Sequence, residues 1–295
     1  MSSDSLADAE PLIFTETICA GVEFSVRPDR VLFAGHTGLQ AIHIFDHAVL
    51  GRVLALDHVV QTTESDEFIY HEMLVHVPML WHGSARSVLV IGGGDGGTLR
   101  EVLRHPVERA VMVELDADVV KYCRAHLPTL SAGAFDDRRT ELVFGDGADY
   151  VRETPYRFDA IIIDSTDPIG PGKVLFEAEF FRACQACLNP GGVLVNQNGT
   201  PAFMPTALAA SAAALRQVFA HTGFYYVPVP TYVSGVMALG WASDRSDLAR
   251  VQPDILAARQ DALGLACRWY SPAVHQAALA EPPALRALHT RDCGT

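Results

Sequence analysis

Acidic side chains follow four successive apolar segments of this 295-residue sequence, each of a length typical of a buried strand. These acidic residues are Asp95, Glu114, Asp146, Asp164 and Asp167. Doubly wound sheets bind ligands at the carboxyl ends of their strands, so the five side chains are predicted to surround one ligand. Each buried carboxylate would bear a desolvation cost unless a cation is supplied. A cationic substrate explains the set best. Magnesium is the alternative, but it usually comes with a phosphate group. The carboxyl ends of the strands, called the rim from here on, have no lysine that could bind such a phosphate.

The first acid stands in a glycine-rich run, residues 92–97 with the sequence GGGDGG, between a predicted strand and a predicted helix. Glycine allows a tight turn and lets a ligand approach the backbone closely. A dinucleotide pyrophosphate would lie at the N-terminus of that helix, beside the Asp95 carboxylate that repels it. The run therefore favours a nucleoside with a positive substituent, such as a sulfonium, unless Asp95 only caps the helix.

The next two acids have positions typical of nucleoside contacts. Glu114 follows the glycines by about 20 residues, where a carboxylate can accept hydrogen bonds from both ribose hydroxyls. Asp146 lies between two glycines, where it could accept from an adenine amino group or belong to an ordinary turn. Asp116 is predicted to be a helix N-cap rather than a ligand.

The last two acids, Asp164 and Asp167, begin a loop that also contains Pro168 and Pro171. Two acids three residues apart after a buried strand are difficult to explain as turn chemistry, and the prolines stiffen the loop, as expected of a lid. Residues 196–199 place neutral hydrogen-bonding groups at the same rim. Most of the 12 histidines are expected to be surface or core groups, and His71 is retained as a candidate.

Two regions with different patterns position these residues. Residues 11–64 contain predicted strands at 30–34, 41–45 and 51–60 between turn residues, which predict a small β-domain over residues 1–64. From residue 65 strands alternate with helices, which predicts an α/β domain over residues 65–295 with a parallel sheet covered on both faces. Its predicted strands are 87–91, 110–114, 141–144, 159–163 and 192–196. Its predicted helices are 66–79, 98–105, 117–126, 177–188 and 207–214.

The remainder of the chain is less regular. Segments 224–229 and 236–242 predict an antiparallel hairpin at one edge of the sheet. The tail from residue 244 is predicted to be mostly helical, with Pro253, Pro272, Pro282 and Pro283 as breaks.

Composition excludes several classes of protein. Apolar residues make up 49% of the chain and charged residues 19%, which excludes a disordered chain. The 35 acidic and 22 basic residues give a net charge of −13, and such a surface repels nucleic acid. No apolar run approaches the about 20 residues of a membrane span, and the acidic start is unlike a signal or transit peptide. We therefore expect a cytoplasmic protein.

Six cysteines in a chain of this length are expected to be reduced cytosolic thiols. Only Cys184 and Cys187 have a spacing that suggests zinc, but no second pair follows them. They stand late in a predicted helix, whereas redox pairs favour a helix N-terminus. Core packing is the preferred interpretation, and no metal site is predicted.

Longer motifs occur in a fixed order along most of the chain. They are GRVLALD, VVQTTE and DEFIYHEM within residues 51–73, VLVIGGGDGGTLREV at 88–102, VELD at 113–116, DSTDPIGPG at 164–172, NPGGVL and NQNG within 189–199, and PTY with SG within 230–235. From about residue 39 to about residue 275, the sequence resembles the spermidine synthases of the bacterial type, which are polyamine aminopropyltransferases. It departs from them at His58, where a glycine is usual, and in the first 38 residues, which lack the expected Trp-containing start. The hairpin at His58 is therefore expected to differ.

The resemblance implies a Rossmann-like, methyltransferase-type doubly wound sheet after a small N-terminal β-domain, and a homodimer or homotetramer. It implies transfer of an aminopropyl group from decarboxylated S-adenosylmethionine to putrescine, giving spermidine and 5′-methylthioadenosine, with no resident cofactor. Asp164 would be the catalytic acid/base. The residues at the amine would be Tyr70, His71, Asp95, Asp167, Gln197 and Tyr232. The residues at the nucleoside would be Gln40, Glu114, Asp146, Gly147 and Pro171.

Two other functions share some of these features. A small-molecule N-methyltransferase would use the same fold, but its cofactor carries a carboxylate that Asp95 would repel. A catalytically idle polyamine sensor or assembly partner would not need the intact pair Asp164 and Asp167. The preferred amine, whether putrescine, cadaverine or a longer one, does not follow from the sequence.

Overall fold

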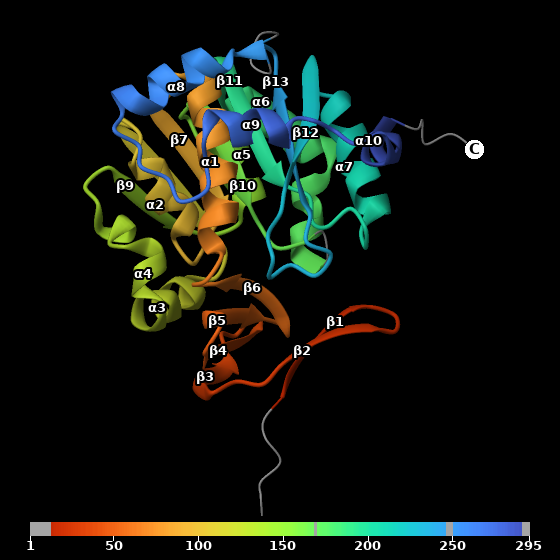
Figure 1. Ribbon diagram of the computed structural model, residues 1–295. Helices are drawn as coiled ribbons and strands as arrows, with labels where there is room; N and C mark the ends of the chain where they lie inside the picture. The colour runs from red at the N-terminus through yellow and green to blue at the C-terminus, as the bar shows by residue number, and fades with distance from the viewer. Residues whose placement is uncertain (1–12, 168–169, 246–249, 291–295) are drawn as a thin grey trace, which may run out of the picture.

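The protein consists of a small β region and a larger α/β region, drawn at the bottom and top of Figure 1. The computed structural model describes residues 13–167, 170–245 and 250–290. A mixed seven-stranded sheet with helices on both faces follows the antiparallel β region, which confirms the predicted fold class. Within the described residues, no helix is both long and apolar enough to cross a membrane.

The β region begins with an antiparallel hairpin of two strands, β1 (Phe14–Cys19) and β2 (Val22–Val26). A four-stranded antiparallel sheet follows, with its strands in chain order: β3 (Arg30–His36), β4 (Ala41–His47), β5 (Gly51–Leu56) and β6 (Val59–Thr63). The single strand predicted over 51–60 is wrong, because a turn at Asp57 and His58 divides it into β5 and β6. Both turn residues have positive φ, 47° and 64°, in the left-handed region that favours glycine.

The ring of His58 packs against two other rings of the β region. Its centroid lies 4.9 Å from that of His43 on β4 and 6.3 Å from that of Phe14 on β1. Phe14 also packs against Phe45, and only 7% of its surface is exposed. The residue that replaces the usual glycine therefore joins the first hairpin to the sheet.

The larger sheet has the strand order β12-β13-β11-β10-β7-β8-β9. Its five parallel strands are β7 (Ser87–Gly92), β8 (Arg109–Glu114), β9 (Thr140–Phe144), β10 (Phe158–Asp164) and β11 (Leu188–Gln197). β13 (Met237–Ser243) runs antiparallel to both β11 and the edge strand β12 (His221–Val227), which confirms the predicted edge hairpin. The apolar segments Val88–Ile91 and Ala160–Ile163 are buried in the middle of the sheet, as continuous hydrophobic runs predict.

Helices alternate with these strands as predicted, with differences at their ends. They are α1 (Glu67–His82), α2 (Gly97–Leu103), α3 (Ala117–His126), α4 (Pro128–Ser131), α5 (Gly147–Glu153), α6 (Ala178–Cys187), α7 (Pro205–Arg216), α8 (Pro253–Ala262), α9 (Pro272–Ala278) and α10 (Pro283–Thr290). α1 continues through Pro78 and ends at His82, with Gly83 as its left-handed C-cap. The predicted end at residue 79 is therefore wrong. α5 was not predicted, because Asp146 between glycines resembled an ordinary turn.

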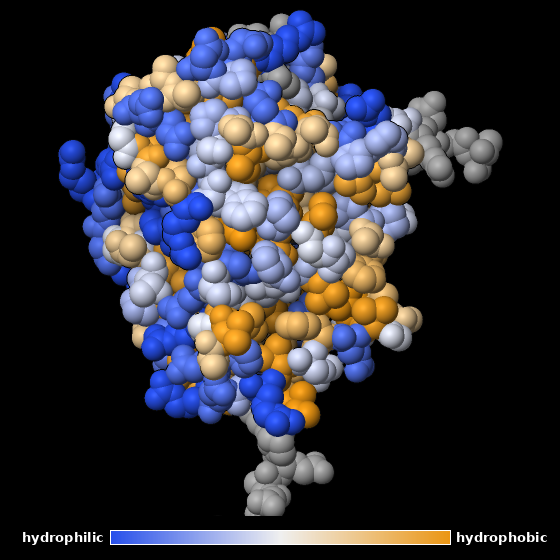
Figure 2. All heavy atoms as spheres, viewed as in Figure 1, coloured by the Kyte–Doolittle hydropathy of each residue, from blue (hydrophilic) through white to orange (hydrophobic). Residues whose placement is uncertain are grey.

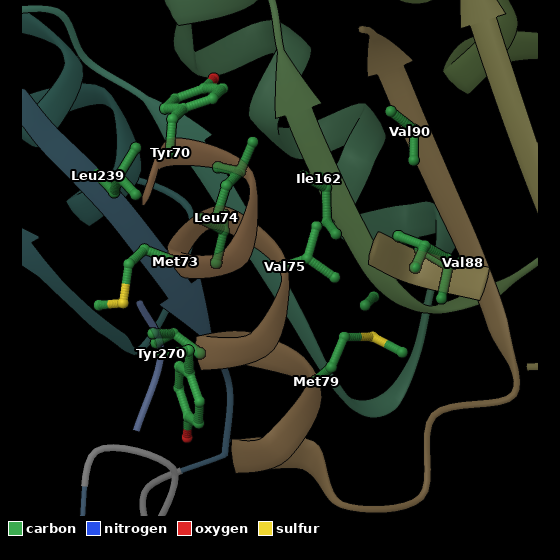
Figure 3. Packing of buried hydrophobic residues seen from close by; sticks show 14 of the residues in the cluster. Tyr70, Met73, Leu74, Val75, Met79, Val88, Val90, Ile162, Leu239 and Tyr270 are labelled. Atoms are coloured by element: carbon green, nitrogen blue, oxygen red, sulfur yellow. The ribbon is translucent and has the colours of Figure 1, made fainter. Parts of the chain in front are cut away.

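Two hydrophobic clusters cover the two faces of the sheet. One contains residues of α1, α2, α8 and α9, and the other contains residues of α5, α6, α7 and α10. Cys184 and Cys187 are buried in the second cluster as unpaired thiols, which confirms their core packing. Figure 3 shows Tyr70, Leu74, Val75 and Met79 of α1 on one side of the sheet strands that carry Val88 and Ile162.

The C-terminal tail covers the outer side of α1, a helix that is buried around most of its surface. The Glu72 carboxylate accepts backbone hydrogen bonds from Arg268, Trp269 and Tyr270 at 2.7–2.8 Å. Arg259 of α8 donates to the carbonyl oxygens near the end of α1. The tail therefore holds the helix that carries Tyr70 and His71 against the sheet.

The two regions share a further hydrophobic cluster. Val119, Cys123 and Leu127 of the α3 segment pack against Ile42 and Leu56 of the antiparallel sheet, together with other residues of both elements. Figure 2 shows hydrophilic side chains over most of the visible face and apolar ones gathered toward its lower part. The rim of the larger sheet thus lies next to the β region.

Candidate active site

The centre of the rim is the end of β10, where Asp164 lies opposite Gly92 of the neighbouring β7. One carboxylate oxygen of Asp164 accepts a hydrogen bond of 2.6 Å from the Tyr70 hydroxyl, and the other accepts one of 2.6 Å from Thr98. Burial raises the pKa of Asp164, the nearby Asp95 charge adds to the rise, and His71 opposes it. The two hydrogen bonds fix the plane of a carboxylate whose basicity is greater than usual.

The glycine-rich loop packs directly on this strand end. Gly92 and Gly93 have φ of 82° and 75°, and the Gly93 amide donates a 2.8 Å hydrogen bond to the Asp164 carbonyl. A Cβ atom on Gly92 would lie 2.1 Å from the same carbonyl oxygen. Glycine is therefore required both for the turn and for the close approach.

Asp95 has the helix-capping role that the sequence left as one of two alternatives, and its role toward a cationic substrate stays a prediction. Its Oδ1 accepts a 2.7 Å hydrogen bond from the amide of Gly97, the first residue of α2, and so satisfies the helix end. The same oxygen lies 3.6 Å from His71 Nε2. Burial would raise the pKa of Asp95, but His71, the Gly97 amide and Arg100 lower it, so the group is ionised.

His71 has a carboxylate at each ring nitrogen, because Glu67 Oε2 lies 2.6 Å from its Nδ1. Burial would lower the pKa of His71, but Asp95 and Glu67 raise it to about 10. The ring is therefore an imidazolium at neutral pH. It has no lone pair with which to take a proton from an amine.

Asp116 links Glu114, at the end of β8, to Gln40 of the β3–β4 loop. Glu114 accepts a 2.9 Å hydrogen bond from the Asp116 amide, and burial raises its pKa to about 7. Asp116 caps α3 by accepting from the Asp118 amide, which confirms the predicted N-cap. Its other oxygen accepts hydrogen bonds from Thr37 and, at 2.9 Å, from Gln40. The β region thus supplies one wall beside Glu114.

Asp146 is the N-cap of α5 and accepts hydrogen bonds from the amides of Ala148 and Asp149. A Cβ atom on Gly147 would lie 2.4 Å from Ile91 Cγ2, so this position admits only glycine. The alternative of an ordinary turn is wrong, since the residue begins a helix. The predicted contact of Asp146 and Gly147 with adenine stays a prediction.

Three predicted amine residues lie near Asp164, namely Asp167, Gln197 and Tyr232. Gln197 donates 2.8 Å to the Ser165 carbonyl and accepts 2.7 Å from the Gly199 amide, so it holds the loop that carries Asp167. The Tyr232 hydroxyl donates 2.6 Å to the Gln61 carbonyl, and its ring stands at 86° to that of Tyr70 with centroids 6.2 Å apart. Burial raises the pKa of Asp167 and of Tyr232, so the phenol stays protonated.

Part of the predicted lid cannot be compared, because residues 168–169 and the side chain of Pro171 lie outside the described residues. Pro171 itself falls in the first turn of a 3-10 helix over Gly170–Phe176. The predicted nucleoside contact of Pro171 stays a prediction.

Sequence reasoning missed Glu16, which β1 brings to the same side as Asp167. Glu16 accepts a 3.0 Å hydrogen bond from the Val60 amide of β6. Burial raises the pKa of Glu16, and the nearby negative charge of Asp167 adds to the rise. Thr98 and Glu67 were also missed. Only the spacing of four between Glu67 and His71 on a predicted helix could have indicated one of these contacts.

Comparison with known proteins bears on what this rim does. Residues 12–64 match the spermidine synthase tetramerisation domain, and residues 67–252 match the spermine/spermidine synthase domain. The chain belongs to the spermine/spermidine synthase family. Proteins named polyamine aminopropyltransferase from Escherichia fergusonii and Shigella flexneri are each 51% identical to this family member over 88% of its chain and 90% of theirs.

Two solved structures show how far this spermine/spermidine synthase family member shares its fold. A spermidine synthase crystallised with the transition state analogue AdoDATO is 38% identical, with a TM-score of 0.90 over 95% of both chains. The spermidine synthase from Thermotoga maritima is 37% identical, with a TM-score of 0.87 over 95% of this chain and 94% of the other. The predicted family, fold and enzyme class are confirmed.

Proposed function

We propose that the protein transfers an aminopropyl group from decarboxylated S-adenosylmethionine to putrescine, giving spermidine and 5′-methylthioadenosine. The observation that carries the proposal is the charge at the rim. Within the described residues, Asp95, Asp164 and Asp167 converge there without an ion pair to lysine or arginine. Such a site has negative charge to offer to cationic substrates, and both proposed substrates are cations.

On the donor side, we propose that Glu114 binds the ribose hydroxyls, that Asp146 and Gly147 contact adenine, and that Gln40 closes the pocket. A carboxylate at the end of the second strand suits a ribose, and the glycine loop lets the nucleoside approach the backbone. Asp95 then faces the substituent on sulfur. It attracts the ammonium of the decarboxylated donor and repels the carboxylate of S-adenosylmethionine.

On the acceptor side, the amine must lose a proton before it attacks, because an ammonium of pKa ~10.4 has no lone pair. Asp164 is suited to accept this proton, since burial raises its basicity and Tyr70 and Thr98 fix its orientation. His71 is excluded as the base because it is already protonated. Asp167, with Tyr232 and Gln197 beside it, anchors the second ammonium.

The reaction balances without a resident cofactor, which we also propose the enzyme lacks. The amine nitrogen forms a bond to the propyl carbon, the carbon–sulfur bond breaks, and its electron pair neutralises the sulfonium as a thioether. The proton of the amine passes to Asp164 and then to solvent. Alignment of nitrogen, carbon and sulfur by the two binding pockets contributes much of the acceleration.

We further propose a homotetramer, with the β region as the site of assembly, acting in the cytoplasm on small molecules rather than nucleic acid. The match to a tetramerisation domain supports the assembly. Three apolar side chains of the β region support it as well, since Val31, Leu39 and Val49 are 40%, 61% and 76% exposed. The five unpaired cysteines of the described residues fit a reducing compartment.

The decisive experiment compares the two donors. Calorimetry should give much tighter binding of decarboxylated S-adenosylmethionine than of S-adenosylmethionine, and a single turnover with putrescine should yield spermidine. The Asp95→Asn variant should lose most of the preference between donors. Methylation of the amine by S-adenosylmethionine would instead identify an N-methyltransferase, and binding of polyamine without turnover would identify a sensor.

A further inference from the structure

Four side chains of alternating charge form a line that leads from α2 to the rim. Arg100 Nη2 lies 2.8 Å from Glu67 Oε2, which lies 2.6 Å from His71 Nδ1, and His71 Nε2 lies 3.6 Å from Asp95 Oδ1. The exposed fractions of these side chains are 17%, 8%, 2% and 12%. Only Asp95 and His71 were expected near a substrate, so the first two members require an explanation of their own.

The surroundings of His71 favour its cationic form from every side. Glu67 comes from its own helix, Asp95 from the β7–α2 loop and Asp164 from β10, and all three are acidic. The one positive neighbour in this line, Arg100 of α2, contacts Glu67 and lies behind it as seen from His71. A neutral ring would have to turn a lone pair toward one of two carboxylates, which repels it.

The ring of His71 also has little room to turn. A Cβ atom on Gly97 would lie 2.3 Å from His71 Cε1, so the ring occupies the space that a side chain would fill. The Gly97 amide in turn donates to Asp95 Oδ1. His71 and the start of α2 therefore hold the same oxygen of Asp95. Its Oδ2 has no hydrogen bond to any other described residue and is available to a substrate.

We infer that Glu67 and Arg100 are positioning residues that keep His71 doubly protonated, and that this cation fixes Asp95 as an oriented anion facing the substrates. Arg100 orients the Glu67 carboxylate, which accepts a hydrogen bond from the Nδ1 proton of His71. The Nε2 proton then points at Asp95. The inference rests on the proposed function in one respect, namely that Asp95 binds a substrate ammonium.

The cation at His71 favours the ionised form of Asp95 before any substrate is bound. Asp95 and Asp164 repel one another, and burial favours the protonated form of each. A fixed imidazolium lowers the pKa of both, so Asp95 keeps its charge before a cation arrives. His71 thus acts on a bound substrate through Asp95, and the predicted contact of its own ring with the amine stays a prediction.

The charge of His71 can be measured without any reaction. In protein labelled with ¹⁵N-histidine, nitrogen shifts should show both ring nitrogens of His71 protonated at pH 8, with the signal assigned by its loss in His71→Gln. A neutral His71 at pH 8 in the wild-type protein would overturn the inference. This measurement stands even if Glu67 variants do not fold, and even if the protein fails to transfer aminopropyl groups.

Kinetics of Glu67→Gln then tests the positioning role, with Glu101→Gln as the matched control. Glu101 is also buried and contacts the same Arg100 at 2.8 Å, but its other neighbours are His76 and Arg104 rather than His71. Glu67→Gln should lower kcat/KM for putrescine by about 10–100-fold, the loss typical when the hydrogen-bond partners behind metal ligands are removed. The loss should grow between pH 7 and pH 9 as His71 becomes neutral. Glu101→Gln should keep the wild-type pH profile.

Two kinetic outcomes contradict the inference. A wild-type pH profile in Glu67→Gln would show that the protonation of His71 does not depend on Glu67. Equal changes in both variants would show that each glutamate only supports the packing of α2. If the wild-type enzyme itself makes no spermidine, the proposed function fails instead, and the nitrogen shifts still decide the charge of His71.

Discussion

Replacement of Glu114 by glutamine should stabilise the empty protein and at the same time weaken its binding of the nucleoside. Glu114 stands at the end of β8, and burial raises its pKa from an ordinary 4.5 to about 7. Glutamine has the same shape and can still accept the hydrogen bond from the Asp116 amide. The change therefore removes the charge and little else.

The size of the effect follows from the pKa. A carboxyl group whose pKa is raised on folding binds its proton more tightly in the folded state. Below the unfolded pKa of 4.5 the group is protonated in both states and does not reduce the free energy of unfolding. The cost develops as the pH rises from 4.5 to 7 and is complete above that. At about 1.4 kcal/mol per pKa unit, the rise to about 7 corresponds to about 3 kcal/mol at pH 8. For a chain of this size the melting temperature should increase by roughly 5–10 °C.

Thermal melts at pH 4.5 and pH 8, with and without 5′-methylthioadenosine, measure both effects. Without ligand, Glu114→Gln should melt higher than the wild type at pH 8 and at the same temperature at pH 4.5. With saturating nucleoside, the wild type should gain about 3 kcal/mol at a hundredfold excess over its Kd, and the variant should gain much less. Glu153→Gln, on the exposed end of α5, is the control and should change neither. If Glu114→Gln is no more stable than the wild type at pH 8, burial does not oppose the charge of Glu114, and the reasoning fails.

Further predictions concern the amine side of the site. Asp164→Asn should lower kcat by ~10²–10⁴-fold, because it removes the proton acceptor but keeps the size of the side chain, and steady-state assays would reveal any near-normal turnover that contradicts it. Asp167→Asn should mainly raise KM for putrescine, and the double variant should show less than the sum of the two effects, since both act on one amine. Activity of the wild type should rise from neutral to mildly alkaline pH as the amine loses its proton more readily, whereas a steady fall above pH 7 in a stable enzyme would oppose this mechanism. Glu16→Gln should raise KM for the diamine up to about 5-fold with nucleoside affinity unchanged, whereas Glu23→Gln on the neighbouring strand should leave both quantities unchanged.

The sequence predicts the larger fold well because its signals are local. Val88–Ile91 and Ala160–Ile163 are continuous apolar runs, and only a sheet covered on both faces buries them. The acidic residues follow these strands directly, so the rim of the sheet brings Asp95, Glu114 and Asp164 together without knowledge of any distant contact.

The parts that the sequence does not predict depend on contacts between distant segments. No local pattern indicates that Glu16 meets Asp167, or that Arg100 meets Glu67 across two helices. The protonation of His71 depends on Asp95, which lies 24 positions along the chain, so no local pattern predicts the charge of this ring. The local pattern predicts one strand over 51–60 because His58 is not the glycine that usually marks a left-handed turn, and only the family resemblance indicates a hairpin there.

Two hydrogen bonds that join the β region to the α/β region imply an order in which the walls of the site form during synthesis. Gln40 finds its partner Asp116 76 residues later, which at 5–20 residues per second means a delay of roughly 4–15 s. Tyr232 bonds to Gln61 across 171 residues, so the aromatic wall of the amine pocket is translated roughly 9–34 s after the β region it closes on. A growing chain can therefore complete the wall around Glu114 well before it can complete the wall beside Asp164. During synthesis the proposed nucleoside wall can therefore exist while the proposed amine wall is still untranslated.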